Sequence, residues 1–264
     1  MNSLRTSILG SLSGLPYKIH PSLHFKIYKL LVDCGLKGLA QDVVVSFAVK
    51  HIKKGDCVVD VGANRGTYTY SMVKAVGKHG IVYSFEPNPV IAAQLRSNLK
   101  SSNAVIENLA VSDTSEDKEF YRHTRGAGPT SSLEFYDVLD RDGELEKITV
   151  KCVTLDSYCR SHNLKPALIK VDVEGHELNV FKGAVETIRS HCPCLVFEFI
   201  EQLWETKNVK DIFALLSPAY HLIRIEDGAD ALEAYADYKP QCDPDFRKSR
   251  VVNIGCIPRE AARH

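Results

Sequence analysis

The chain has 264 residues, of which 44% are hydrophobic and 25% charged, a composition typical of a folded domain with its own hydrophobic core. Lys plus Arg and Asp plus Glu number 33 each, so the formal net charge is zero, and this balance argues against an electrostatic nucleic-acid binder. No apolar run approaches the roughly 18 residues that suggest a membrane-spanning helix.

Two helices are predicted at the start of the chain. Apolar side chains recur at helical spacing over residues 22–33 and again over 42–51. We expect an N-terminal helical segment, 1–52, followed by one larger domain over 53–264. The helices would cover a sheet edge or lie over a site, and the pattern leaves both arrangements open.

A short strand and a glycine turn follow at Cys57–Gly66. The strand is rich in β-branched residues without alternation, which is typical of a central parallel strand covered on both faces. Gly62 and Gly66 allow the backbone to turn sharply and to approach a ligand. Asp60 lies in the apolar strand, where a carboxylate is costly to bury unless something binds there. The stretch therefore predicts a ligand site.

Helices and strands then alternate. The expected elements are a helix over 67–76, a strand over 81–85, a helix over 89–99 and a strand over 104–111. Glu86 closes the second of the strands, the position at which dinucleotide-type folds hydrogen-bond the ribose hydroxyls of an adenosine. Combined with the preceding glycine turn, Glu86 predicts a sheet that binds a nucleoside.

Residues 114–150 interrupt this alternation. Strand-like segments at 118–122 and 147–153 flank a polar stretch with Gly, Pro and Ser, which predicts a β-hairpin-like insertion. Ligand contacts collect in loops on the carboxyl side of the strands in open α/β sheets. Residues 122–125 are therefore candidates for substrate contact, and a solvated loop fits the pattern equally well.

The second informative stretch is Ala167–His176. Lys170, Asp172 and Glu174 alternate with apolar residues, so on a strand they would share one face. The strand lies between helical segments, so both of its faces should be covered. Three ionisable side chains on a covered face are costly unless they pair with one another or serve a site.

A helix over 176–190 and a strand over 194–199 are expected next. Glu198 lies near the end of that strand and would join the acidic group if the two strands are neighbours. His176, at the expected helix start, is interpreted as a capping or surface residue. The remaining expected elements are a helix over 209–216 and strands over 220–225 and 251–257.

Five segments together resemble a known family, namely Val58–Gly66, Phe85–Pro89, Ala110–Asp113, Thr154–Asp156 and Ile169–Gly175. They are similar to the FkbM family of S-adenosylmethionine-dependent methyltransferases, and the Lys-x-Asp-x-Glu-Gly stretch is the most specific of them. The resemblance implies a Rossmann-like class I methyltransferase fold. This fold is a doubly wound, mostly parallel seven-stranded sheet with an antiparallel last strand.

The resemblance also implies a function and a cofactor site. Family members are mostly O-methyltransferases, so we expect methylation of a hydroxyl on a sugar, polysaccharide or secondary metabolite. Asp60 and Gly62 would line the methionine end of the cofactor. Glu86 would hold the ribose, and Ser112 with Asp113 the adenine. The full set of expected cofactor-binding residues is Asp60, Gly62, Asn64, Gly66, Glu86, Asn88, Ser112 and Asp113.

The acidic group supplies the candidate catalytic residues. An alcohol is a poor nucleophile at neutral pH, so a general base near its proton assists transfer. Asp172 is the first candidate for base or hydroxyl orienter, followed by Glu174 and Glu198. Lys170 is expected to pair with one of these acids and keep it ionised. The same carboxylates also suit a hard divalent metal ion that polarises the hydroxyl.

Two other classes of function stay open. A nicotinamide-dependent oxidoreductase would use a similar sheet, although Gly62-x-Asn64-x-Gly66 departs from the Gly-x-Gly-x-x-Gly spacing. A non-catalytic cofactor-binding protein would have no use for the acidic group. The eight cysteines form no CxxC pair, so we expect free thiols and a reducing, cytoplasmic compartment. No motif specifies the small-molecule or glycan acceptor or the oligomeric state.

Overall fold

The computed structural model describes residues 21–35, 43–123, 131–134, 145–200, 209–236 and 251–260. The helices are α2 (Pro21–Asp33), α4 (Val43–His51), α5 (Thr67–Val76), α6 (Pro89–Asn98), α7 (Leu155–Ser161), α8 (Glu177–Lys182), α9 (Val185–His191), α10 (Val209–Leu216) and α11 (Ala231–Tyr235). The strands are β1 (Cys57–Val61), β2 (Ile81–Phe85), β3 (Ala104–Glu107), β4 (Ala110–Val111), β5 (Asp117–His123), β6 (Leu145–Val153), β7 (Pro166–Val171), β8 (Cys194–Ile200), β9 (Tyr220–Arg224) and β10 (Val251–Pro258).

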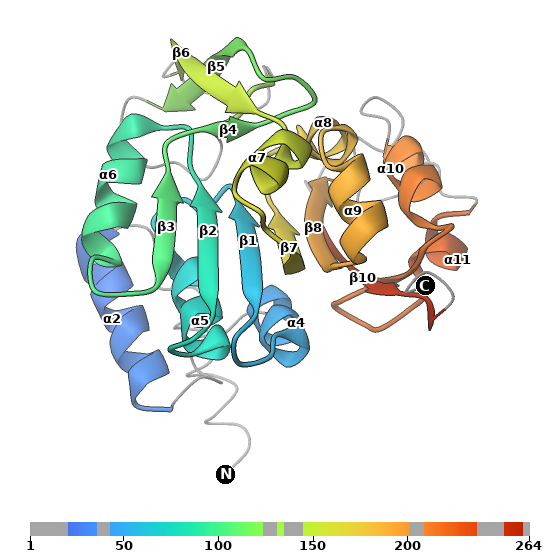
Figure 1. The fold of residues 1–264 in the computed structure, drawn as a ribbon, viewed down its shortest axis with the longest axis horizontal. Coiled ribbons are helices and arrows are strands. Elements are labelled where there is room, and N and C mark those ends of the chain that lie inside the picture. Colours follow the sequence, from blue (N-terminus) through green and yellow to red (C-terminus); the bar gives the residue numbers. More distant parts are fainter. Residues whose placement is uncertain are drawn as a thin grey trace, which may run out of the picture.

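Seven strands form one sheet in the order β3-β2-β1-β7-β8-β10-β9 (Figure 1). The strands pair in parallel except β10, which is antiparallel to both β8 and β9. The chain winds outward from β1 to β3 and then returns to place β7 on the other side of β1, so the strand order reverses between β1 and β7. This confirms the predicted doubly wound sheet with an antiparallel last strand.

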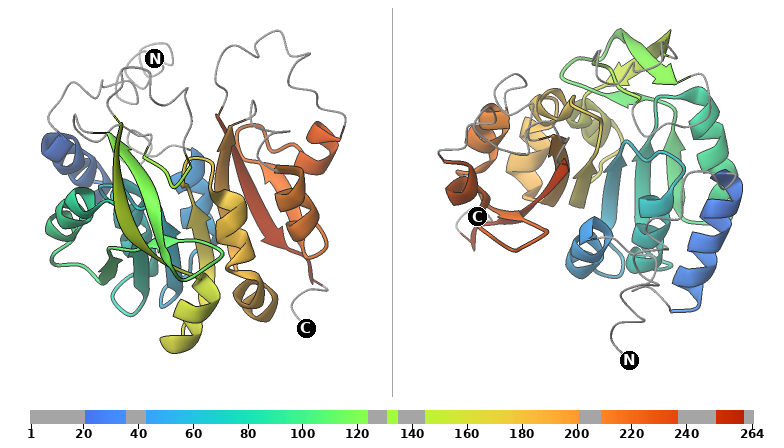
Figure 2. Two further views of the ribbon diagram at one scale, coloured as in Figure 1. Left: turned by 90° about the horizontal axis from the view of Figure 1, so that it is seen from above. Right: turned by 180° about the vertical axis from the view of Figure 1, so that it is seen from behind.

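Helices cover both faces of this sheet (Figure 2). Val58 of β1 belongs to a core cluster shared with α4 and α5. Val59 and Val61 belong to a second cluster shared with α7, α8, α9 and α10. Successive β1 side chains are therefore buried on opposite faces, which explains why the strand is apolar without alternation.

The N-terminal helices pack against the same sheet. Phe25 and Tyr28 of α2 are buried against α5 and α6. Val44 of α4 is buried with residues of β7 and β8. Gly255 of β10 has no room for a side chain because a Cβ there would meet the ring of Phe47 in α4. Helix α4 is therefore seated over the middle of the sheet and α2 nearer its β3 edge.

The predicted strand over 104–111 is wrong, because it is two strands in two sheets. β3 ends at Glu107, and the Asn108 side chain then donates to the backbone carbonyls of Glu86 (2.9 Å) and Pro87 (2.8 Å). The chain turns there, and β4 pairs with β6 instead of with the main sheet. A continuous apolar run does not reveal this turn, since both strands are half or fully buried.

The predicted β-hairpin-like insertion is confirmed over its described residues. β5 and β6 pair antiparallel, and with β4 they form a three-stranded sheet near the carboxyl ends of the main strands (Figure 1). Arg122, a candidate substrate contact, forms an ion pair with Glu146 at 2.8 Å. His123 ends β5, and residues 124–125 lie outside the described residues.

The predicted helix over 176–190 is also wrong, because it is two short helices, α8 and α9. They separate at Gly183, where a Cβ would collide with the backbone oxygen of Ser112. The Asp156 carboxylate accepts from the backbone N–H groups of Glu186 (3.0 Å) and Thr187 (2.7 Å), which satisfies the first turn of α9. A close backbone approach and a distant side-chain cap therefore divide the helix.

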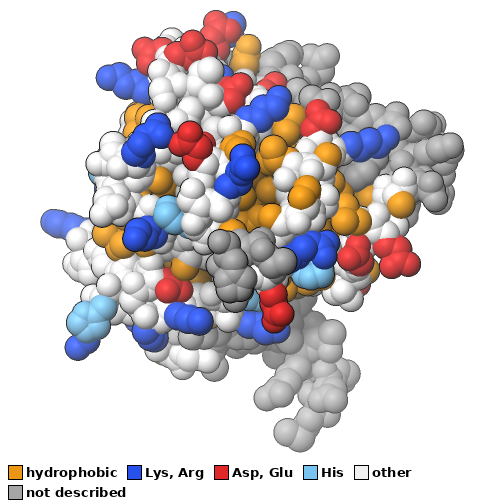
Figure 3. All heavy atoms as spheres, turned by 45° about the vertical axis from the view of Figure 1, so that its right-hand side comes forward, with side chains coloured by type: hydrophobic (Ala, Val, Ile, Leu, Met, Phe, Trp, Pro, Cys, Tyr) orange, Lys and Arg blue, Asp and Glu red, His pale blue; other side chains and the backbone are white. Residues whose placement is uncertain are grey.

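The surface agrees with the balanced composition. Figure 3 shows Lys and Arg side chains interspersed with Asp and Glu over one face, with hydrophobic side chains between them. None of the described helices is long and apolar enough to cross a membrane. The seven cysteines in the described part of the chain are free thiols, as expected from their spacing.

Candidate active site at the carboxyl end of the sheet

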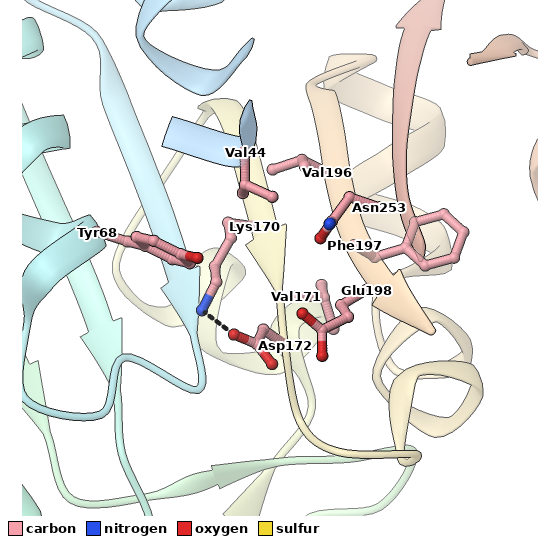
Figure 4. A pocket seen from close by; sticks show the side chains of 9 residues that line it. All are labelled: Val44, Tyr68, Lys170, Val171, Asp172, Val196, Phe197, Glu198 and Asn253. Carbon is pink, nitrogen blue, oxygen red and sulfur yellow. Dashed lines mark ion pairs between the residues drawn. The ribbon is translucent and has the colours of Figure 1, made fainter. Parts of the chain in front are cut away.

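A pocket opens at the carboxyl ends of β7 and β8, and it contains about 180 Å³ of empty space partly open to solvent (Figure 4). Its lining residues are Val44, Tyr68, Lys170, Val171, Asp172, Val196, Phe197, Glu198 and Asn253. Ionisable side chains from the two central strands and the Asp172 loop therefore meet aromatic, apolar and amide side chains from α4, α5 and β10.

Lys170 connects the two halves of this edge. Its Nζ lies 3.2 Å from Asp172 Oδ2 and 3.3 Å from Asp60 Oδ1, and it donates to the backbone oxygen of Gly62 at 3.0 Å. Burial opposes the charged form of Lys170, but the attraction of the Asp172 and Asp60 carboxylates outweighs it and raises the pKa of Lys170 well above its usual range. The predicted pairing of Lys170 with an acid is confirmed, and Lys170 pairs with two acids, Asp60 and Asp172.

Asp60 lies beneath the edge rather than on it. Its side chain is fully buried, and Oδ2 accepts a hydrogen bond from Thr69 Oγ1 at 2.6 Å. Among the described residues, Oδ1 has the Lys170 ammonium as its neighbour and accepts no hydrogen bond. The ion pair and the Thr69 hydroxyl explain how an apolar strand can hold this carboxylate.

The expectation that Lys170, Asp172 and Glu174 share one face of a strand is wrong. β7 ends at Val171, and the Asp172 N–H makes one last ladder bond to Val61 O at 3.1 Å. Glu174 then adopts a left-handed backbone conformation with φ 55°. Glu174 therefore reaches the site through a turn and not through strand alternation.

The three carboxylates nevertheless meet. One oxygen each from Asp172, Glu174 and Glu198 lie within 4.8 Å of one another. β7 and β8 are parallel neighbours with Val171 opposite Phe197, which brings the end of β7 beside Glu198. The predicted grouping of Glu198 with Asp172 and Glu174 is confirmed. Burial, followed by the charges of Asp172 and Glu198, raises the pKa of Glu174 to about 9.

A second group of predicted residues lies at the ends of β1 and β2. The Glu86 carboxylate is 7% exposed and accepts from the backbone N–H groups of Asn64 and Asn88, each at 2.9 Å. Burial raises the pKa of Glu86 to about 7 despite these bonds. Gly62 and Gly66 have φ of 77° and 92°, so the turn uses the left-handed conformations that glycine allows. The Asn88 side chain caps α6 through Val90 N and Ile91 N.

The Ser112–Asp113 turn is tied to His176. Ser112 Oγ is buried and lies 2.9 Å from His176 Nε2, and Lys118 donates to both Ser112 Oγ and Asp113 Oδ1. The Lys118 ammonium holds the pKa of Asp113 below its usual range. His176 is 4% exposed, and its Nδ1 lies 3.0 Å from Glu134 Oε1 of the insertion. His176 does occupy the N-cap position of α8, but its side chain makes no capping hydrogen bond and is buried, so the interpretation as a surface residue is wrong.

Sequence reasoning missed two residues that hold the site together. Glu177 is 5% exposed and accepts from the N–H groups of Val173 and Gly175. Ser132 of the insertion is 2% exposed and reaches the carbonyls of Val173 and Glu174. An acid in the first turn of a helix is an ordinary surface pattern, and a serine in a polar loop is equally ordinary. No local signal distinguishes them.

The buried acids predict a pH-dependent stability. Burial raises the pKa of Glu86 and of Glu177 to about 7 from 4.5, so the folded state favours their neutral forms. Their contribution to the free energy of unfolding is fully present below pH 4.5 and is lost as the pH rises through about 7. We expect the midpoint of thermal unfolding to fall between about pH 5 and pH 8.

The matching variant is the double substitution Glu86→Gln and Glu177→Gln, which removes both titrations. At Glu177 the amide oxygen can still accept both N–H groups, and at Glu86 one of the two acceptor oxygens is kept. The pH-induced fall in its unfolding midpoint should be smaller than in the parent by about 5 °C. Differential scanning calorimetry at the two pH values measures this, and an equal fall in both proteins would contradict the assignment.

One family model, one curated protein and two solved structures are similar to this chain. The model of the Methyltransferase FkbM domain matches residues 60–224. A curated protein, hexuronic acid methyltransferase AglP of Haloferax volcanii, is 27% identical over 220 residues and covers 82% of each chain. A solved structure, methyltransferase FkbM from Methylobacillus flagellatus, is 14% identical to this chain with a TM-score of 0.47. The match covers 95% of this chain and 57% of the solved chain. Aeropyrum pernix fibrillarin with bound S-adenosyl-L-methionine is 15% identical with TM-score 0.44, covering 88% of this chain and 76% of its own.

Proposed function

Because the chain belongs to the FkbM family of S-adenosylmethionine-dependent methyltransferases, we propose that it methylates a hydroxyl group of a sugar, either free or within a glycan. The relative AglP is named for its action on hexuronic acid, which supports a sugar as acceptor. The observation that carries the proposal is the contact of Lys170 with both Gly62 in the glycine turn and Asp172 in the acidic group. The family match removes the oxidoreductase and non-catalytic alternatives.

The ends of β1 and β2 fit an adenosine by the chemistry of their donors and acceptors. Each oxygen of Glu86 accepts one backbone hydrogen bond in the described part of the chain, and a carboxylate oxygen has room for a second. We assign these two free positions to the ribose hydroxyls. The Ser112–Asp113 turn would border the adenine, and the Gly62–Gly66 backbone the methionine end.

Asp60 and Asn88 have indirect parts in this assignment. The Asp60 side chain is fully buried against Thr69 and Lys170, so it supports the turn from below. The Asn88 side chain caps α6, and its backbone N–H holds Glu86. Both residues would shape the cofactor site without their side chains touching the cofactor.

The acceptor hydroxyl is assigned to the pocket beside the acidic group. When bound, S-adenosylmethionine supplies an electrophilic sulfonium methyl group. We propose that Asp172 orients the sugar hydroxyl and accepts its proton, because its side chain is 27% exposed at the pocket and is held in place through Oδ2 by Lys170. Glu198 lies close enough to take up that proton afterwards, whereas Glu174, with its pKa raised to about 9, is already protonated at neutral pH. Most of the rate would come from positioning the two reactants.

A divalent cation is a second use of the same three carboxylates. Their oxygen spacing suits one hard ion, which would polarise the hydroxyl in place of the proton acceptor. We favour proton transfer to Asp172 over a bound cation, because the Lys170 ammonium already provides a positive charge beside Asp172.

Transfer of label from methyl-labelled S-adenosylmethionine to a panel of neutral hexosides and hexuronides tests the proposal. We expect label on a sugar oxygen, and we expect transfer to survive a chelator. If the chelator abolishes transfer and Mg²⁺ restores it, the divalent cation is favoured. If the label appears on a nitrogen or carbon atom, or if no saccharide is labelled, sugar O-methylation is contradicted. Glu86→Ala should weaken cofactor binding by roughly 10- to 150-fold, the equivalent of about 1.5–3 kcal/mol.

A further inference from the structure

The loop Asp172–Gly175 carries two of the three carboxylates in an unusual backbone conformation. Glu174 and Gly175 have φ of 55° and 97°, so two consecutive residues lie in the left-handed region. Such a conformation is unfavourable for glutamate and persists only where surrounding contacts impose it. A relaxed Glu174 would direct its side chain elsewhere and break up the group with Asp172 and Glu198.

Contacts from the adjoining helix α8 and from the distant insertion impose this conformation. From α8, Glu177 Oε1 accepts the N–H groups of Val173 at 3.3 Å and Gly175 at 3.0 Å. From the insertion, Ser132 Oγ lies 3.1 Å from Val173 O and 2.9 Å from Glu174 O, so its hydrogen is shared between the two carbonyls. Glu177 thus binds the backbone N–H groups of the loop, and Ser132 binds its backbone carbonyl groups.

Both partners are themselves fixed. Glu177 is buried at the start of α8, and Ser132 is fastened to β5 by two backbone hydrogen bonds with Tyr121, at 2.8 and 3.0 Å. Ser132 Oγ also accepts from the N–H of Glu134 at 3.0 Å. The hydroxyl therefore cannot turn away from the loop without losing several bonds.

We propose that Glu177 and Ser132 are positioning residues, which hold the Asp172–Gly175 loop so that the Asp172 carboxylate faces the acceptor pocket and the Glu174 carboxylate stays grouped with it. This inference rests on the proposed methyl transfer at that pocket. Neither residue lines the pocket, so both act through the loop. A loop displaced by about 1 Å is enough to lower a rate about 100-fold.

Two variants and one matched control test the proposal. Glu177→Ala removes both acceptor bonds, and Ser132→Ala removes only a hydroxyl that the main sheet does not need. Asp156→Ala is the control, because Asp156 is likewise a carboxylate that accepts two backbone N–H groups, at α9. We expect kcat to fall about 10- to 100-fold in the first two, with S-adenosylmethionine affinity within about twofold. Asp156→Ala should lose stability and keep kcat.

Two further readouts separate positioning from a merely structural role. Glu177→Gln keeps an oxygen acceptor and should restore kcat to within about threefold of the parent. The double variant of Glu177 and Ser132 should lose less in kcat than the two single losses combined, because both act on one loop. Amide hydrogen exchange of Val173 and Gly175 should accelerate in Glu177→Ala and stay slow in Asp156→Ala. This readout does not depend on which molecule accepts the methyl group.

The outcomes are decisive. Unchanged kcat in Ser132→Ala and Glu177→Ala, an equal kcat loss in Asp156→Ala, or a parallel loss of cofactor affinity would each overturn the proposal. If Glu177→Ala does not fold, Ser132→Ala decides. A parent protein that transfers methyl groups to no sugar refutes the proposed function instead, and hydrogen exchange then still tests the loop.

Discussion

Replacing Asp172 with asparagine is expected to lower kcat for methyl transfer by about 10²- to 10⁴-fold, the usual contribution of a general base. The amide keeps the size of the side chain and can still face the hydroxyl, but it cannot accept a proton. Lys170 keeps its ion pair with Asp60, so the donor side should be little disturbed. Cofactor affinity is therefore expected to stay within about twofold, measured by calorimetric titration alongside steady-state kinetics.

Asp113→Asn provides the contrast for this experiment. Asp113 lies in the turn that we assign to the adenine and is held by Lys118, so its substitution should affect cofactor affinity more than kcat. If Asp172→Asn keeps full kcat while Glu174→Gln abolishes transfer, the base is Glu174. In that case the rate of the parent enzyme would rise as the pH increases toward 9, because the pKa of Glu174 is raised to about 9.

Replacing Lys170 with methionine is expected to destabilise the fold by about 3–5 kcal/mol. Lys170 is 2% exposed, and its loss leaves the fully buried Asp60 carboxylate without its cation. Methionine fills most of the space of the lysine stem, so the effect measures the lost charge more than a cavity. Urea unfolding followed by circular dichroism gives the free energy of unfolding.

Two control variants show whether this loss of stability comes from the buried ion pair. Arg160→Met breaks an ion pair with Glu186 in which both side chains are 68% exposed, and it should cost less than about 1 kcal/mol. The double variant Lys170→Met with Asp60→Asn removes the orphaned charge and should recover part of the loss. If Lys170→Met costs no more than Arg160→Met, the buried ion pair does not stabilise the turn, and the link between donor and acceptor halves loses its energetic basis.

The acidic group shows how far the sequence can predict a site. Alternation located Lys170 and Asp172 at the end of a central strand, and the expected neighbouring strand brought Glu198 beside them, as the structure confirms. The prediction is wrong about the backbone, because β7 ends at Val171 and Glu174 sits in a left-handed turn. A two-residue period looks the same whether a strand continues or ends, so the pattern could not reveal the turn.

The other errors of prediction come from contacts between residues that are far apart in the sequence. The apolar run over 104–111 divides at Asn108 because that side chain bonds to the backbone after β2. The helix over 176–190 divides because Gly183 packs against Ser112 and because Asp156 caps α9. His176 is buried because Ser112 and Glu134 supply partners for its ring. Each cause lies far away in the sequence.

The sequence by itself determined the order of helices and strands, the mostly parallel sheet, and the residues at the ends of its strands. These follow from hydrophobic periodicity, glycine turns and acids at strand ends, which are local properties of the chain. Only the tertiary structure decided how Asp60, Lys170 and Asp172 pair and how Glu177 and Ser132 hold the loop. The contacts of Lys170 with Asp60 and of Ser132 with the loop join elements that are distant in sequence, and burial strengthens them, so they exist only once the chain has packed. The contacts of Asp172 and Glu177 span only a few residues, but they depend on the left-handed turn that follows β7.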